Sequence, residues 1–290
     1  MVFINAVRGL CMALADSVPG VSGGTIAFLL GFYDRFIASL DDLLHGKKQE
    51  RIVAFKFLLQ LGIGWIVGMT LAILVLTEIF ESHIYAISSL FIGFILFAIP
   101  LVIHEEKATL KGQGKWIFYV LIGIIFVVAV SSFNPISAGG VGSGLGSLLY
   151  VYVGGIIAIS AMVLPGISGS TLLLIMGLYI PVLSAVRSLM GLDFSALPVV
   201  VVFALGVVSG AALVIRLLRY LMSKYRAQMI FLIIGLMLGS IYSVILGPTT
   251  LDIPKDAMTW ETFSILFFLL GGAVIFGLQA TKAIVERKIK

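Results

Sequence analysis

The residues best suited to chemistry in this chain are small polar residues that follow a proline, and they occur twice. Residues 18–25 read VPGVSGGT, and residues 164–171 read LPGISGST. Proline removes a backbone donor and glycine accepts conformations that other residues resist, so each octapeptide predicts a helix that breaks and restarts. The first N–H groups of a restarting helix lack intrahelical partners and carry partial positive charge. Each motif therefore predicts a site for an anion such as phosphate or carboxylate.

The predicted anion sites combine backbone N–H groups, hydroxyl groups and glycines that let a ligand approach the backbone closely. In the first copy, Ser22 or Thr25 can cap the restarting helix. The residues that we assign to anion binding are Ser22, Gly23, Gly24, Thr25, Ser168, Gly169, Ser170 and Thr171. The helix breaks are assigned to Pro19, Gly20, Pro165 and Gly166. The alternative interpretation is a glycine-rich break that serves only close helix packing.

Composition places these motifs in a membrane. The 290 residues are 60% hydrophobic and 11% charged, with a mean hydropathy of +1.18, which excludes an ordinary soluble domain. The net charge of +5 comes without a basic cluster interleaved with aromatic residues, so no nucleic-acid partner is expected. The single cysteine, Cys11, cannot form an intrachain disulfide. No cofactor and no metal site are expected, and Arg8 interrupts the N-terminal apolar run, which argues against a cleaved signal peptide.

The predicted fold is an all-α polytopic membrane protein in a single domain. A helix of about 20 apolar residues crosses the hydrocarbon core of a bilayer. Six segments meet that requirement, at 57–77, 84–103, 116–133, 197–215, 228–247 and 262–280. The regions 3–40 and 147–190 carry the motifs and read as helix, break and helix. They are either re-entrant hairpins or pairs of crossings, and re-entry is favoured for the first because Asn5, Arg8 and Asp16 make its leading arm polar.

The two halves of the chain match at an offset of 146 residues. Residues 19–33 and 165–179 share seven of fifteen positions. The same offset pairs Phe57 with Phe203, Gly64 with Gly210, Leu90 with Leu236, Gly93 with Gly239 and Ile95 with Ile241. We therefore expect repeat 1 over 1–146 and repeat 2 over 147–290, each a hairpin followed by three transmembrane helices.

The distribution of basic residues predicts the orientation of these repeats. With the N-terminus in the cytoplasm, all 19 Lys and Arg residues except Arg187 and Lys255 fall on the cytoplasmic side. Both termini are therefore expected in the cytoplasm. Three crossings per repeat turn the second repeat upside down relative to the first. Inverted repeats whose broken helices meet near the midplane are typical of secondary transporters.

Two charged residues accompany only the first motif. Asp16 lies three residues before Pro19, and Met162 stands at the matching position of the second copy. An acidic side chain at membrane depth is costly and is a functional candidate, so Asp16 is the candidate for coupling to a proton or a sodium ion. Arg8 lies about two helical turns earlier on the same face. It either pairs with Asp16, contacts an anionic headgroup or snorkels to the interface.

An intramembrane serine hydrolase is a less favoured alternative. Residues 20–23 and 166–169 both fit Gly-x-Ser-Gly, the nucleophile pattern of intramembrane rhomboid proteases. A serine nucleophile needs a base within hydrogen-bond reach, and the three histidines, His45, His83 and His104, lie in or beside predicted loops. We therefore expect that this protein is not an enzyme.

The first motif and its flanks resemble a known family. Residues 15–27, ADSVPGVSGGTIA, and residues 30–35, LGFYDR, are similar to the signature of the polyprenyl-phosphate transporter family, long classed as a bacterial and archaeal domain of unknown function. Residues 164–170 resemble the family's second motif, and the resemblance covers nearly the whole chain. Asp34 stands where the family often has glutamate, which keeps the charge.

The resemblance implies a lipid flippase of the bacterial or archaeal cytoplasmic membrane. It implies translocation of undecaprenyl phosphate, which recycles the lipid carrier for cell-wall glycan synthesis, and two re-entrant hairpins. The expected partners are the polyprenyl phosphate lipid and the bilayer. Our hypothesis is alternating access around a phosphate held at the paired breaks, with Asp16 coupling a proton or cation. A secondary transporter of a small soluble anion is the main alternative, because it would use the same anion sites.

Overall fold

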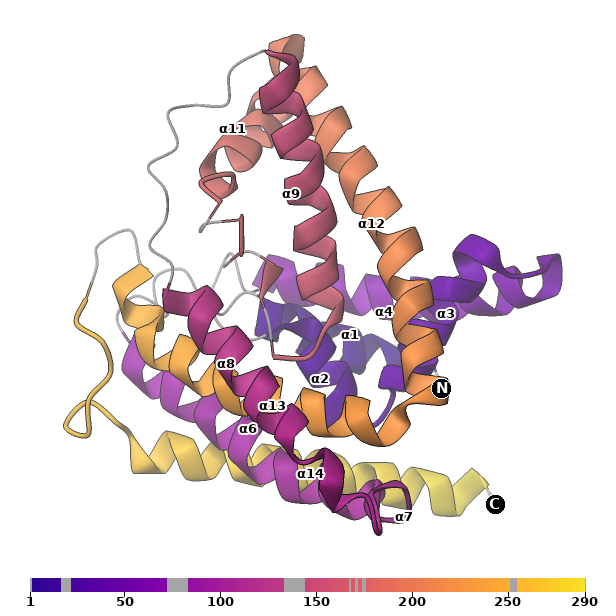
Figure 1. Ribbon diagram of the computed structural model, residues 1–290, viewed down its shortest axis with the longest axis vertical. Helices are drawn as coiled ribbons and strands as arrows, with labels where there is room; N and C mark the ends of the chain where they lie inside the picture. The colour runs from indigo at the N-terminus through magenta and orange to yellow at the C-terminus, as the bar shows by residue number, and fades with distance from the viewer. Residues whose placement is uncertain are drawn as a thin grey trace.

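A computed structural model describes residues 2–16, 22–71, 83–132, 144–166, 168–169, 172–173, 176–250 and 255–289. Within these ranges every regular element is helical and no strand occurs, which confirms the all-α class. The first half contains α1 (Val2–Asp16), α2 (Gly23–Leu29), α3 (Tyr33–His45), α4 (Lys48–Leu71), α6 (Ile84–Glu105), α7 (Lys107–Leu110) and α8 (Phe118–Ser132). The second half contains α9 (Leu145–Val163), α11 (Tyr179–Met190), α12 (Leu197–Lys224), α13 (Arg226–Leu246) and α14 (Ile265–Ile289) (Figure 1).

Six helical segments are long and apolar enough to cross a membrane. They are Lys48–Leu71, Ile84–Glu105, Gly114–Ser132, Leu145–Val163, Phe194–Lys224 and Arg226–Thr249. Five of them overlap predicted spans. The predicted span 262–280 falls in α14, whose described apolar part, Ile265–Gly277, is shorter. The chain is therefore a multi-pass membrane protein, and α9 in the second motif region joins the set of candidate spans.

The leading arms of the two motif regions differ in length. Helix α1 has 15 residues, which gives about 22 Å at 1.5 Å per residue and falls short of a hydrocarbon core of about 30 Å. Helix α9 has 19 residues and meets the length and hydropathy of a span. The described α1 is thus shorter than a span and α9 is long enough for a full crossing, and re-entry of the first region stays a prediction.

The long helices pack as four pairs. Helix α1 packs along α4 and α9 along α12, whereas α6 pairs with α14 and α8 with α13. The last two pairs each join a helix from one half to a helix from the other. In Figure 1, α6, α8, α13 and α14 form the lower layer, and α9, α11 and α12 rise above it. The first and second halves are therefore interlocked through their last helices.

Matching pairs pack through glycines at matching positions. A Cβ atom at Gly9 would overlap the carbonyl of Leu61 on α4, and one at Gly155 would overlap the carbonyl of Phe203 on α12. At such positions the two helix backbones approach closely, as small residues allow in membranes. The contact of Gly64 with Ala6 likewise recurs between α12 and α9, where Gly206 contacts Tyr152.

These contacts correct the residue pairs expected in the later helices. The structure matches Gly64 with Gly206 instead of Gly210, because both contact the equivalent part of the leading arm. It matches Gly93 with Gly235 instead of Gly239, because Gly93 meets the carbonyl of Phe268 on α14 as Gly235 meets that of Val120 on α8. Gly31 and Gly177 are 146 positions apart whereas Gly64 and Gly206 are 142 apart, so one offset cannot hold along the whole chain.

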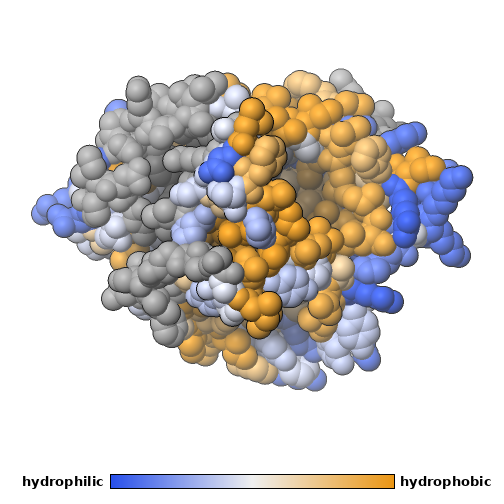
Figure 2. Space-filling model, turned by 90° about the horizontal axis from the view of Figure 1, so that it is seen from above, coloured by the Kyte–Doolittle hydropathy of each residue, from blue (hydrophilic) through white to orange (hydrophobic). Residues whose placement is uncertain are grey.

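The surface suits a bilayer. The main core joins buried residues of α1, α2, α3, α4, α6, α9, α12, α13 and α14. Large apolar side chains of α4, α8, α12 and α14 remain exposed, among them Ile66, Ile125 and Leu213. Seen from above, the surface is largely hydrophobic over its middle, and hydrophilic residues gather mainly at its sides (Figure 2). A contiguous apolar surface of this kind marks contact with lipid.

Candidate functional site

The first motif restarts a helix as predicted. Ser22 has extended backbone and caps α2, because its Oγ accepts a hydrogen bond from the N–H of Thr25 at 3.2 Å. The second motif has the same first turn. The N–H of Ile26 bonds to the carbonyl of Ser22 at 3.3 Å, and the N–H of Leu172 bonds to that of Ser168 at 3.2 Å.

Both motif regions also end in the same turn. Gly31 and Gly177 have φ of 66° and 65°, a left-handed conformation that glycine adopts without the strain of a side chain. The same two backbone hydrogen bonds, of 2.8–3.0 Å, close each turn. In the first region the N–H groups of residues 30 and 32 donate to the carbonyls of residues 26 and 27. In the second region the N–H groups of residues 176 and 178 donate to the carbonyls of residues 172 and 173. The offset of 146 therefore describes the motif regions, where the sequence match is strongest.

The second break lies against the start of α2. The N–H of Gly166 donates to Thr25 Oγ1 at 2.8 Å, and Ser22 Oγ donates to the carbonyl of Leu164 at 3.2 Å. The hydroxyl of Tyr33 donates to the carbonyl of Val163 at 3.2 Å. These bonds join residues more than 120 positions apart, so the second break forms one polar junction with the start of α2.

Gly24 allows the close approach at this junction. A Cβ atom there would lie 2.6 Å from the carbonyl oxygen of Val163. Gly166, with φ of 88°, would meet the backbone of Leu236 on α13. Close packing, the alternative reading of these glycines, is therefore present at the junction, beside the polar contacts.

A carboxylate of the protein lies at the start of α2. Asp16 Oδ1 accepts the N–H of Gly23 at 2.6 Å, and Oδ2 accepts the indole Nε1–H of Trp65 at 2.8 Å. Hydrogen bonds from N–H groups to an ionised acceptor are short and strong, and a phosphate oxygen would make bonds of the same kind. The position predicted for a ligand anion is thus occupied by Asp16 in this structure.

The predicted site residues divide by location. Ser22, Thr25 and Ser168 are buried, as are Gly23, Gly24, Pro165 and Gly166. Gly169 is half-buried and faces the carbonyl of Ala158 on α9. Pro19, Gly20, Ser170 and Thr171 lie outside the described residues.

Arg8 belongs to a polar group on α1. Its Nη1 donates to Asn5 Oδ1 at 3.3 Å, and its guanidinium lies 4.8 Å from the ring centroid of Phe32. Asn5 is buried and donates to Gln60 Oε1 on α4 at 2.8 Å. The leading arm of the first region therefore faces α4 and the hairpin turn with its polar side.

Sequence reasoning missed Trp65, Tyr33 and Gln60. Trp65 and Gln60 lie in an apolar span where nothing distinguishes them from lipid-facing or end residues. Tyr33 is the one with a signal, because it is identical in both motifs and follows the left-handed glycine. Its partner, the carbonyl of Val163, comes from the other half of the chain and could not be found by local pattern.

Among the described residues, the hydroxyl of Ser22 contacts no base. Its partners are Thr25 and the carbonyl of Leu164. His45 bonds to Asp41 at 2.9 Å, at the end of α3. In the part of the chain that the structure describes, no group of three or more His, Cys, Asp or Glu residues could hold a metal ion.

Ion pairs join the two halves on the side where basic residues gather. Arg219 of α12 binds Asp41 and Asp42 of α3. Arg226 at the start of α13 binds Asp34 at 2.9 Å and also binds Glu106. Asp34, which stands in the signature-like segment 30–35, thus holds the hairpin to the second half.

Glu106 directly follows the candidate span Ile84–Glu105. Burial opposes its ionisation, but hydrogen bonds from Arg226 and Thr109 and the charge of Arg226 outweigh burial and lower the pKa of the carboxyl below its usual 4.5. The carboxylate is therefore favoured, and it keeps α6 bound to α13.

Comparisons with known proteins show the family of this chain. The profile of the VCA0040-like family, described as undecaprenyl phosphate translocase-like, matches residues 12–282. A polyprenyl-phosphate transporter of Vibrio cholerae is 31% identical over 245 residues, which cover 81% of this chain and 75% of the relative. A polyprenyl-phosphate transporter of Staphylococcus aureus is 30% identical over 272 residues, which cover 93% of each chain. No solved structure matches the chain.

Proposed function

Because the chain belongs to the VCA0040-like, undecaprenyl phosphate translocase-like family, we propose that it carries undecaprenyl phosphate across the cytoplasmic membrane. Two relatives named polyprenyl-phosphate transporters support this substrate, as does a chain with six apolar helices that could span a bilayer. Both relatives are named as transporters, which agrees with the expectation that the chain is not an enzyme. The role is recycling of the lipid carrier for cell-wall glycan synthesis.

The observation that carries the proposal is the junction of the two breaks beside Asp16. In our proposal the phosphate binds where the Asp16 carboxylate now accepts from Gly23, and hydroxyls of Ser22 and Thr25 complete its ligands. The long apolar tail stays in lipid, so only the headgroup needs a polar path. Ser168, Gly169, Ser170 and Thr171 supply the second half of the site from the opposite side of the membrane.

Competition between Asp16 and phosphate provides the coupling step of the proposal. One N–H group at the start of α2 cannot serve two anions at full strength, and two anions at one position repel each other. Neutralising Asp16 by a proton or a bound cation frees the position for the phosphate. The two halves then exchange access between the membrane faces by alternating access. The expected orientation has both termini in the cytoplasm.

Transport is tested in proteoliposomes that contain undecaprenyl phosphate. Added phosphatase hydrolyses only outer-leaflet lipid unless the protein moves inner-leaflet lipid outward. We expect hydrolysis to exceed the outer-leaflet fraction with the wild type, and to fall back toward that fraction with Gly24→Ala, whose Cβ would meet the carbonyl of Val163. Gly62→Ala is the matched control, because a Cβ there meets nothing within 4 Å.

The same vesicles separate the two transporter hypotheses. Uptake of inorganic phosphate without movement of the lipid would replace our proposal by the alternative of a small-anion transporter. No movement of either substrate, in vesicles where the protein is folded and correctly inserted, would refute both.

A further inference from the structure

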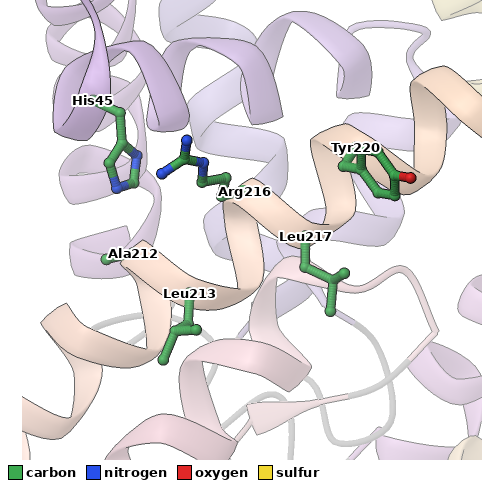
Figure 3. Close-up of a pocket in the computed structure, with 6 residues that line it drawn as sticks. All are labelled: His45, Ala212, Leu213, Arg216, Leu217 and Tyr220. Carbon is green, nitrogen blue, oxygen red and sulfur yellow. The ribbon is translucent and has the colours of Figure 1, made fainter.

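A second polar site lies between α3 and α12, away from the breaks. A cavity of about 470 Å³ is lined by His45 of α3 and by Ala212, Leu213, Arg216, Leu217 and Tyr220 of α12 (Figure 3). Its lining residues come from both halves of the chain. None of them takes part in the junction of the breaks.

The polar wall of this cavity carries an exposed cation, Arg216. The guanidinium of Arg216 points toward the ring of His45 (Figure 3). Among the described residues no hydrogen bond or ion pair is assigned to Arg216, whereas Arg219, one turn later, binds both Asp41 and Asp42. Asp41 and Asp42 are thus already engaged by Arg219, and Arg216 is the cation that we assign to a ligand.

His45 presents its second ring nitrogen for binding. Its Nδ1 lies 2.9 Å from Asp41 Oδ1, and because an ionised carboxylate only accepts, Nδ1 carries the proton. In the neutral ring Nε2 is therefore an acceptor, and in the protonated ring it is a donor. A phosphate monoester satisfies both states, since its monoanion has a P–O–H donor and its dianion accepts.

The other wall is apolar and open to lipid. Leu213 and Leu217 are 71% and 54% exposed and point away from His45 (Figure 3). Arg216 directly follows the apolar run 197–215, which places it at the membrane interface on the side where basic residues gather. Tyr220 has the amphipathic ring that is enriched at this depth. A headgroup at Arg216 would therefore have its tail along the leucines.

We propose that this cavity binds the phosphate monoester headgroup of polyprenyl phosphate at the membrane interface, at a site separate from the helix breaks. The inference rests on the proposed function, because the substrate supplies the monoester. A phosphodiester lipid such as phosphatidylglycerol carries one charge, and its phosphate has no P–O–H group, so that phosphate offers neutral His45 no donor. The cavity thus selects the substrate from the bulk anionic lipids.

Photo-crosslinking tests the site directly. A benzophenone amino acid at Leu217 should crosslink to undecaprenyl phosphate in proteoliposomes, and one at Leu205, exposed elsewhere on α12, should not. We expect Arg216→Gln to weaken the apparent affinity at the Leu217 probe about tenfold, as for a lost charge-assisted hydrogen bond. Arg51→Gln, which removes an exposed charge on the same side, is the control and should leave the crosslink unchanged.

Competition identifies the ligand. An excess of phosphatidylglycerol or of inorganic phosphate should leave the Leu217 crosslink in place, because neither combines a monoester with a lipid tail. Equal competition by phosphatidylglycerol, or an unchanged crosslink in Arg216→Gln, would overturn the proposal. Native mass spectrometry of the wild type distinguishes a failure of the cavity proposal from a failure of the proposed function. Bound undecaprenyl phosphate without a Leu217 crosslink refutes only this cavity, whereas no bound lipid at all refutes the proposed function.

Discussion

The backbone N–H of Gly166 donates a hydrogen bond of 2.8 Å to the hydroxyl of Thr25, and this bond joins the two halves of the chain. Gly166 belongs to the second break and Thr25 to the first turn after the first break. Both residues are buried, so this bond is made away from water. Any motion that changes access at one break must therefore break this bond or carry the other break with it.

We expect Thr25→Val to destabilise the protein by about 1–3 kcal/mol, because valine keeps the shape but leaves a buried N–H without an acceptor. Thermal unfolding in detergent measures the change. Thr70→Val is the control, since Thr70 is exposed on α4 and, within the described residues, its hydroxyl bonds to the carbonyl of Ile66, one turn earlier. Equal effects of the two substitutions would show that the junction does not hold the halves together.

Asp16→Asn should remove the response of transport to an ion gradient. The amide keeps one acceptor oxygen for Gly23 or Trp65 but has no charge to neutralise, so an imposed proton or sodium gradient has nothing to act on. The phosphatase assay, run with and without each gradient, measures this response. Asp193→Asn, at an exposed acid, should keep the wild-type response. A gradient response that survives in Asp16→Asn would remove Asp16 from the coupling role.

The local features of the site could be predicted from the sequence, and its assembly could not. The Pro-Gly-x-Ser-Gly motifs predicted where helices stop and restart, because proline and glycine act on their own neighbours. That Ser22 caps α2 follows from the same local chemistry. The hydrogen bond from Gly23 to Asp16 and the one from Ser22 to Leu164 depend on how the chain folds in three dimensions. No residue spacing in the sequence predicts them.

The later helices show the limit of a fixed offset. Identities at 146 residues paired Gly64 with Gly210, but packing equates Gly64 with Gly206, because only these two glycines face the same turn of the leading arm. In a chain this rich in glycine and leucine, an identity in an apolar helix carries little information. Contact with a neighbouring backbone is what distinguishes a packing glycine from a neutral one.

Gly64→Ala should be destabilising and Gly62→Ala neutral, although both lie in α4. A Cβ at Gly64 would overlap the carbonyl of Ala6, whereas one at Gly62 meets nothing within 4 Å. Overpacking of this kind costs about 1–3 kcal/mol. Thermal unfolding in detergent compares the pair, and Gly206→Ala should match Gly64→Ala because it overlaps Tyr152 in the same way. If Gly64→Ala unfolded at the wild-type temperature, the α1–α4 contact would be looser than the structure has it.

Acid should weaken the bond between α6 and α13 through Glu106. The folded protein lowers the pKa of this carboxyl below 4.5, so its contribution to stability is complete above that value and is lost as pH falls through the lower folded pKa. Glu106→Gln removes the charge that Arg226 binds, and we expect it to lower the melting temperature at neutral pH and to flatten the acid side of the profile. Melting temperatures from about pH 7 down to about pH 3.5 measure the two slopes. Glu261→Gln, at an exposed glutamate, is the control and should keep the wild-type slope. Identical profiles for Glu106→Gln and the wild type would mean that the ion pair with Arg226 adds nothing to the stability of this interface.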